Sequence, residues 1–192
     1  MTEERARLFV ALELPAQVRE ALVSWRDQTL PAGVLETVRP ISGEALHLTL
    51  CFLGWQETAA VDAIAQACDS LLGAPAPTLS LGEAVWLPKR RPRVLAVALH
   101  EQGARLGQMQ AALSRVLVNG GWYQPESRAF LAHVSVARVT KAARGHRRTI
   151  AEPPAIAEPP AISFLARELV LFRSRLTPNG ARYERLHTTS LG

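Results

Sequence analysis

Two short segments of the chain repeat one pattern of residue types, and this repetition constrains the fold more than any other feature of the sequence. His47-Leu-Thr-Leu50 and His133-Val-Ser-Val136 each read histidine, aliphatic, hydroxyl, aliphatic. Alternation with a period of two is typical of a β-strand that buries only one face. The aliphatic side chains of both segments are therefore expected in a core, with the histidine and the hydroxyl together on the opposite face.

The hydrophobic pattern along the whole chain predicts more strands than helices. Strands are expected at 8–14, 46–53, 79–87, 93–99, 129–139, 164–172 and 181–187, and helices at 15–25, 61–72 and 104–118, the last closed by Gly120-Gly121. Turn residues join strands as hairpins through the basic loop 88–93 (PKRRPR) and through Thr177-Pro-Asn-Gly180. Because hairpins separate the helices, the order favours an α+β fold over a doubly wound parallel sheet.

A tandem repeat follows the second histidine segment. The hexapeptide IAEPPA occupies 150–155 and again 156–161, directly after a basic cluster that extends over 138–148. Paired prolines favour an extended polyproline conformation. We therefore expect the repeat to be an exposed loop, and we assign it no chemistry.

Length and composition limit the class of protein. With 192 residues, 48% of them hydrophobic and 20% charged, the chain is long enough for one compact domain over 1–192 or for two small lobes. Cys51 and Cys68 lie in apolar stretches and are expected to be buried thiols in a reducing cytoplasm. Glu13 interrupts the N-terminal apolar run, so neither a signal peptide nor a membrane span is expected.

Positive charge is concentrated in the second part of the chain. Residues 1–83 hold 11 acidic and 5 basic side chains, whereas residues 84–192 hold 6 acidic and 17 basic ones. Only Lys89 and Lys141 are lysines, and the planar fork of arginine suits phosphate better than an ammonium group does. Either a coding bias towards arginine or phosphate recognition explains the excess, and composition alone favours the coding bias.

The two histidines offer proton transfer near neutral pH. A neutral imidazole takes a proton from water, and a protonated one gives a proton to a departing oxygen, which suits in-line displacement at phosphorus. Thr49 and Ser135 would hold the non-bridging oxygens of the phosphate. This chemistry requires no metal, and the remaining histidines, His100, His146 and His187, show no ligand spacing.

A single histidine on a strand is more often structural than catalytic. Two copies, each followed by a hydroxyl and each carried by the same alternation, favour function. A different class of protein, a non-catalytic RNA-binding module that uses arginines and aromatic side chains, stays open as an alternative. The chain has no recognised RNA-binding motif, however, and binding alone would not need two pairs of imidazole and hydroxyl.

The paired motifs resemble those of the two-histidine (2H) phosphoesterases, in particular the RNA 2′,3′-cyclic phosphodiesterases once called 2′-5′ RNA ligases. Family-like blocks cover nearly the whole chain: RLFVALELP at 7–15, LHLTLCFLG at 46–54, RPRVLAVAL at 91–99, FLAHVSVAR at 130–138 and LVLFRSRLTPNGARYERL at 169–186. The resemblance implies two pseudo-symmetric lobes around a central cleft and no dissociable cofactor. It also implies that His47 donates a proton to the leaving ribose oxygen and that His133 is the base for water, which yields a 2′-phosphate.

The resemblance further implies that Arg138 contacts the phosphate and that Phe52 lies near the base. Both residues follow their histidine by five positions, an odd offset that points to the core face unless the strand twists or bulges. The second motif departs from the family in having Ser135 and Val136 where threonine and leucine are common, and Ala132 where proline often stands. Serine keeps the hydroxyl but lacks the β-methyl that restricts its rotamer.

The partners that the resemblance implies are RNA ending in a 2′,3′-cyclic phosphate or small cyclic nucleotides. Reversible 2′-5′ ligation of RNA or tRNA halves uses the same two histidines, so the sequence leaves it open as an alternative activity. We expect a monomer, since the sequence has no heptad pattern and no long exposed apolar edge.

Overall fold

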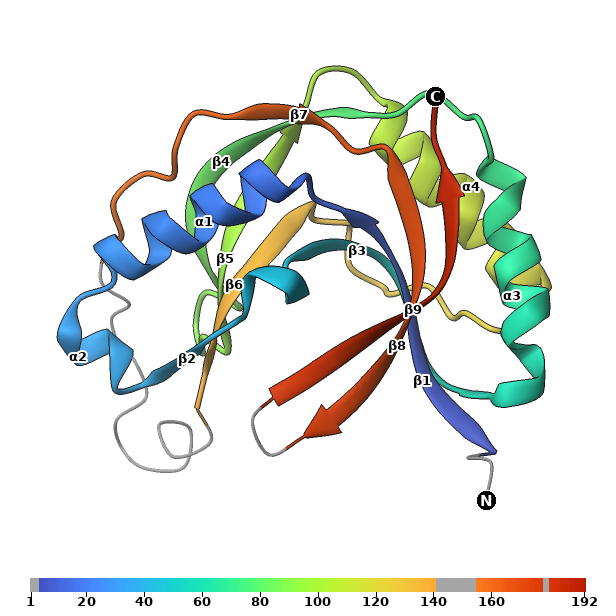
Figure 1. Ribbon diagram of the computed structural model, residues 1–192, viewed down its shortest axis with the longest axis horizontal. Helices are drawn as coiled ribbons and strands as arrows, with labels where there is room; N and C mark the ends of the chain where they lie inside the picture. Colours follow the sequence, from blue (N-terminus) through green and yellow to red (C-terminus); the bar gives the residue numbers. More distant parts are fainter. Residues whose placement is uncertain (1–3, 141–154, 178–179) are drawn as a thin grey trace.

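The computed structural model describes residues 4–140, 155–177 and 180–192 (Figure 1). Within these ranges nine strands form one sheet: β1 (Arg5–Glu13), β2 (Val38–Pro40), β3 (His47–Glu57), β4 (Thr78–Leu87), β5 (Val94–Glu101), β6 (His133–Val139), β7 (Ser163–Leu165), β8 (Glu168–Thr177) and β9 (Gly180–Ser190). The α-helices are α1 (Ala16–Thr29), α2 (Ala32–Leu35), α3 (Val61–Cys68) and α4 (Arg105–Asn119). Three short 3₁₀ helices, η1 (Gly43–Ala45), η2 (Thr58–Ala60) and η3 (Asp69–Leu71), complete the described elements.

The sheet consists of two halves that meet at the two histidine strands. Its order is β7-β4-β5-β6-β3-β1-β8-β9, with β2 also paired to β6. The strands β3 and β6 join antiparallel through Leu48 and Val134. Each half therefore contributes one histidine strand to the junction, as the resemblance to the 2H phosphoesterases implies.

Helices cover one face of the sheet and cross between the halves. Helix α1 follows β1 but packs on β6, whereas α4 follows β5 and packs on β3. Helix α3 packs against α4, β8 and β9. Figure 1 shows α1 and α2 on one flank of the molecule and α3 and α4 on the other. The expected α+β fold with two lobes is confirmed.

The two faces of the sheet differ in what they bury. Leu8, Val10 and Leu12 of β1 alternate into the helix-covered core together with Leu48 and Val134. On the opposite face a smaller apolar cluster forms from β1, β8 and β9, comprising Phe9, Ala11, Val170, Phe172 and Tyr183. The prediction that the aliphatic residues of both motifs enter the core is confirmed.

Two predicted strands differ from the observed ones, and two short observed elements were not predicted. The strand expected over 129–139 begins only at His133, because residues 129–132 pair with the sheet at one point only, where Leu99 N–H donates to Ala132 O at 2.9 Å. The strand expected over 164–172 is two strands, since β7 pairs with β4 in one half and β8 pairs with β1 in the other. The short elements β2 and α2 are absent from the sequence-based prediction.

The second copy of the hexapeptide is held against the fold rather than exposed throughout. Ile156 packs on the main core, and the Nε1–H of Trp25 donates to Ala157 O at 3.1 Å. This copy is a loop, as predicted, with Ala157, Glu158 and Ala161 exposed, but Ile156, Pro159 and Pro160 are only partly exposed. Residues 141–154, which include most of the basic cluster and most of the first copy, lie outside the described residues.

Candidate active site

The two histidine strands, β3 and β6, lie side by side in the sheet and run antiparallel. Leu48 is the partner of Val134, and in an antiparallel pair this register places His47 opposite Ser135 and Thr49 opposite His133. These four side chains line one small pocket together with Arg138. The pocket thus brings together five of the six residues that the sequence analysis singled out.

Both imidazoles are anchored in the same way. Nδ1 of His47 lies 2.8 Å from Ala45 O, and Nδ1 of His133 lies 2.9 Å from Leu131 O, in each case the carbonyl two residues earlier. A carbonyl only accepts hydrogen bonds, so each Nδ1 carries the proton and each Nε2 is left with its lone pair. The hydroxyl of Thr49 donates to Nε2 of His47 at 3.0 Å.

A bulge in each strand brings the fifth residue after the histidine onto the histidine's face. In β3 the register against β1 skips Leu50, and Leu50 and Cys51 are both buried. In β6 the register against β5 skips Val136, and Val136 and Ala137 are both buried. An extra residue reverses the alternation beyond it, which is why Phe52 and Arg138 are exposed on the pocket side. Phe52 and Arg138 therefore avoid the core face because both strands bulge, which is the exception to strict alternation stated above.

Aromatic rings surround His47. Its ring centroid lies 4.8 Å from that of Phe9, 5.1 Å from Tyr183 and 6.1 Å from Phe172. The pKa of His47 is lowered from 6.5 to about 4, mainly by burial among these rings; the Ala45 carbonyl opposes this, and the nearby Arg138 and His133 add smaller lowering effects. The imidazole of His47 is therefore neutral at pH 7.

Phe52 lies on the far side of Thr49 and is not a core aromatic. Its side chain is 44% exposed, and the guanidinium carbon of Arg7 lies 4.7 Å from its ring centroid. Arg7 also donates to the hydroxyl of Ser174 at 3.3 Å. Arg7, Phe52, Arg138 and Tyr183 contribute to a second pocket that borders His47.

Arg7, Phe9, Phe172 and Tyr183 are site residues that the sequence analysis missed. They come from β1, β8 and β9, strands other than the two that carry the histidine motifs. The signal that could have found them is the parity along β1: Arg7 and Phe9 share a face with Glu13, the residue that pairs with His47.

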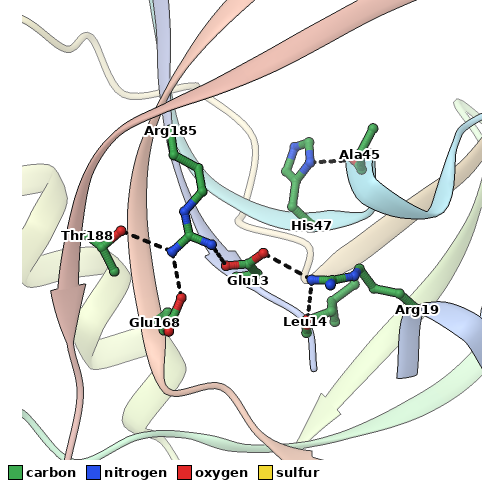
Figure 2. Close-up of polar contacts among 8 residues, drawn as sticks. All are labelled: Glu13, Leu14, Arg19, Ala45, His47, Glu168, Arg185 and Thr188. Atoms are coloured by element: carbon green, nitrogen blue, oxygen red, sulfur yellow. Dashed lines mark hydrogen bonds and ion pairs between the residues drawn. The ribbon is translucent and has the colours of Figure 1, made fainter. Parts of the chain in front are cut away.

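A charged network borders His47 on the β1 side (Figure 2). Arg19 and Arg185 both donate to the carboxylate of Glu13, the former at 3.0 Å. Arg185 also donates to Glu168 at 2.7 Å and to Thr188 at 3.1 Å, and its guanidinium lowers the pKa of Glu168. The network ties the start of α1 to β8 and β9 beside the pocket.

A larger groove of about 630 Å³ opens beside His133 and Thr49. It begins at Thr49, Phe52 and His133 and extends over the base of the loop 88–93 towards the segment before β6. Arginines and aromatic rings both contribute to its lining: Arg93, Arg128, Tyr123 and Phe130. The groove could hold an extended chain that carries both phosphates and ring systems.

No group of three or more histidine, cysteine, aspartate or glutamate side chains within the described ranges is arranged to hold a metal ion. None of the helices in the described part of the chain is both long and apolar enough to cross a membrane.

Two imidazoles and two hydroxyls around one pocket are groups suited to acid/base chemistry on a phosphate ester. Comparison with known proteins agrees: a model of the LigT-like phosphoesterases matches residues 12–96. The RNA 2′,3′-cyclic phosphodiesterase of Escherichia coli strain K12 is 31% identical over 193 residues, which cover 98% of both chains. The chain therefore belongs to the LigT-like phosphoesterases, the 2H family that its motifs resemble, and it is a hydrolase.

Solved structures support the same relation. The E. coli LigT structure in complex with 3′-AMP superposes with a TM-score of 0.80 at 28% identity, covering 98% of this chain and 99% of that one. The complex of E. coli LigT with phosphate gives a TM-score of 0.76 at 26% identity over the same shares. The TT0787 structure from Thermus thermophilus, with a TM-score of 0.76 at 24% identity over 96% of this chain and 97% of that one, shows the shared fold.

Proposed function

We propose that this protein hydrolyses 2′,3′-cyclic phosphates at the ends of RNA or on nucleotides, that His47 and His133 are its proton donor and acceptor, and that the product is a 2′-phosphomonoester. The observation that carries the proposal is the single pocket that His47, His133, Thr49, Ser135 and Arg138 line together. The E. coli relative is named for this activity.

The reaction assigns one task to each side chain. Nε2 of His133 takes a proton from water as the water oxygen bonds to phosphorus. The bond from phosphorus to the 3′ oxygen breaks, and His47 gives its proton to that oxygen. Thr49, Ser135 and Arg138 donate hydrogen bonds to the non-bridging oxygens, where negative charge accumulates in the transition state. The balance needs only water, so the proposal includes no metal and no cofactor.

The low pKa of His47 sets a condition on its role as donor. The imidazole is neutral at pH 7, so as a donor it must gain a proton when the substrate binds. A phosphate anion in the pocket favours the charged form of the ring. We therefore expect proton uptake on binding of a nucleoside 2′-phosphate, measurable by calorimetry in buffers of different ionisation enthalpy.

The groove that begins at His133 suits the RNA strand on the 5′ side of the cyclic phosphate. Arg93 and Arg128 would contact its phosphates and Phe130 would stack on a base, while Phe52 stacks on the terminal base. The loop 88–93 reaches this groove through Pro88 and Arg93. The basic excess of residues 84–192 thereby gains a use in substrate binding.

We further propose that the protein acts as a monomer in the cytoplasm. Cys51 and Cys68 are both free and buried, a state that a reducing compartment maintains.

The proposal is tested by incubating the protein, with a chelator present, with an RNA oligomer that ends in a 2′,3′-cyclic phosphate. The proposal is supported if the ring opens and the 2′-phosphate is the only product. An RNA-binding module would bind the oligomer and leave the ring closed, and a ligase would join the end to a 5′-hydroxyl oligomer added to the same reaction. Either of these results in place of hydrolysis would overturn the proposal.

A further inference from the structure

Arg26 is the only charged residue that the described part of the chain buries. It lies on α1 with 5% of its surface exposed, and its Nε donates to Asp27 at 2.8 Å. Burial of a guanidinium is costly unless its hydrogen bonds are made. What Arg26 contacts inside the protein therefore indicates why it is there.

The buried end of Arg26 reaches two backbone carbonyls. Its Nη1 donates to Ile41 O, just after β2, and to Val136 O at 3.2 Å in β6. The same Val136 carbonyl accepts a hydrogen bond from Ile41 N–H at 3.0 Å. Arg26 thus fastens the end of β2 to one residue of β6.

Val136 is the residue at which β6 bulges. It has no partner in the register against β5, where Ala96 pairs with Ser135 and Leu95 with Ala137. The bulge brings Arg138 onto the face of His133 and Ser135. Without it Arg138, five residues after His133, would point into the core.

We propose that Arg26 is a positioning residue that holds the bulge of β6 and, through it, directs Arg138 into the phosphate pocket. This inference rests on the phosphate-binding role of Arg138 in the proposed function. Arg26 itself touches no reacting atom: it contacts Asp27 and two carbonyls on the core side of the strand.

The test is a double-mutant cycle between Arg26→Met and Arg138→Ala, with hydrolysis of 2′,3′-cyclic AMP as the activity. Arg26→Met is expected to raise KM at least about tenfold, because Arg138 would lose its charge-assisted hydrogen bond to the phosphate. The effect on kcat should be smaller. In the Arg138→Ala background the same substitution is expected to leave kcat/KM unchanged. Arg26→Lys keeps one donor and should restore part of the affinity, which also keeps the test valid if the methionine variant folds poorly.

Trp25→Phe is the matched control. It removes the hydrogen bond to Ala157 O from the same helix, so it should lower thermal stability without raising KM. Equal losses of kcat/KM from Arg26→Met in both backgrounds, or no loss in either, would overturn the inference.

Binding of inorganic phosphate separates this inference from the proposed function. The wild type, the two single variants and the double variant are each titrated with inorganic phosphate. The four dissociation constants give the double-mutant cycle without turnover. Coupling between Arg26 and Arg138 in phosphate affinity supports the inference even if the wild type opens no cyclic phosphate. Additive effects on phosphate affinity overturn it even if the enzyme is active.

Discussion

The imidazole of His47 owes its protonation state to groups outside its own motif. The Ala45 carbonyl fixes the tautomer, and Phe9, Phe172 and Tyr183 keep water from the ring. His133 has the same backbone anchor but lies in the more open groove. The two histidines thus have the same place in their motifs but different surroundings. Different surroundings allow two imidazoles to take different protonation states, as one acid and one base require.

A sulfur leaving group distinguishes the donor from the acceptor. In a cyclic nucleotide with sulfur in place of the 3′ oxygen, the departing thiolate needs no proton, so loss of the donor should cost little. We expect the loss of kcat from His47→Ala to shrink by about 10²-fold or more on this substrate, while the loss from His133→Ala persists. Shrinkage for His133→Ala instead would reverse the two roles.

His47 also makes stability depend on pH. Because its pKa is about 4 when folded and 6.5 ordinarily, the unfolded chain binds a proton there between these values and the folded protein does not. This contribution to the free energy of unfolding is complete above pH 6.5 and is lost as the pH falls to about 4. Denaturant titrations should show a shallower decline for His47→Asn than for the wild type, and parallel curves would contradict the pKa.

At the scale of elements, alternation predicted which face of each motif is buried, but it could not place the bulges. Leu50 and Val136 look like ordinary core positions in the sequence, and the extra residue at each depends on pairing with β1 and β5. The motif pattern was sufficient to predict that His47, Thr49, His133 and Ser135 lie together. It could not predict Arg7 and Tyr183, because these residues reach the pockets from other strands. Local pattern identifies a face, whereas register decides its neighbours.

The groove beside His133 should discriminate between long and short substrates. Arg93→Ala combined with Arg128→Ala is expected to raise KM for an RNA oligomer and to flatten its dependence on salt, because two phosphate contacts are lost. The KM for 2′,3′-cyclic AMP should hardly change, since a mononucleotide does not extend into the groove. Arg105→Ala, which removes an arginine outside the residues that line the groove, is the control. Equal effects on both substrates would return the basic excess to coding bias.

At the scale of the whole molecule, the two halves of the sheet depend on each other. They share the junction of β3 and β6 and one continuous core. Two helices also connect them, because α1 follows β1 but packs on β6, and α4 follows β5 but packs on β3. We therefore propose a single domain and expect one unfolding transition, with far-ultraviolet circular dichroism and tryptophan fluorescence changing together. Two separate transitions would show that the lobes fold independently.

The measurement that tests the account most directly is hydrolysis of 2′,3′-cyclic AMP, with a chelator present, by the wild type and by His47→Ala and His133→Ala. His100→Ala is the matched control, because His100 is an exposed histidine paired with Glu83 outside the site. We expect 2′-AMP from the wild type and from His100→Ala, and a loss of at least about 10²-fold in kcat for each of the other two variants. A wild type that leaves the ring closed, or pocket variants as active as the wild type, would contradict the account.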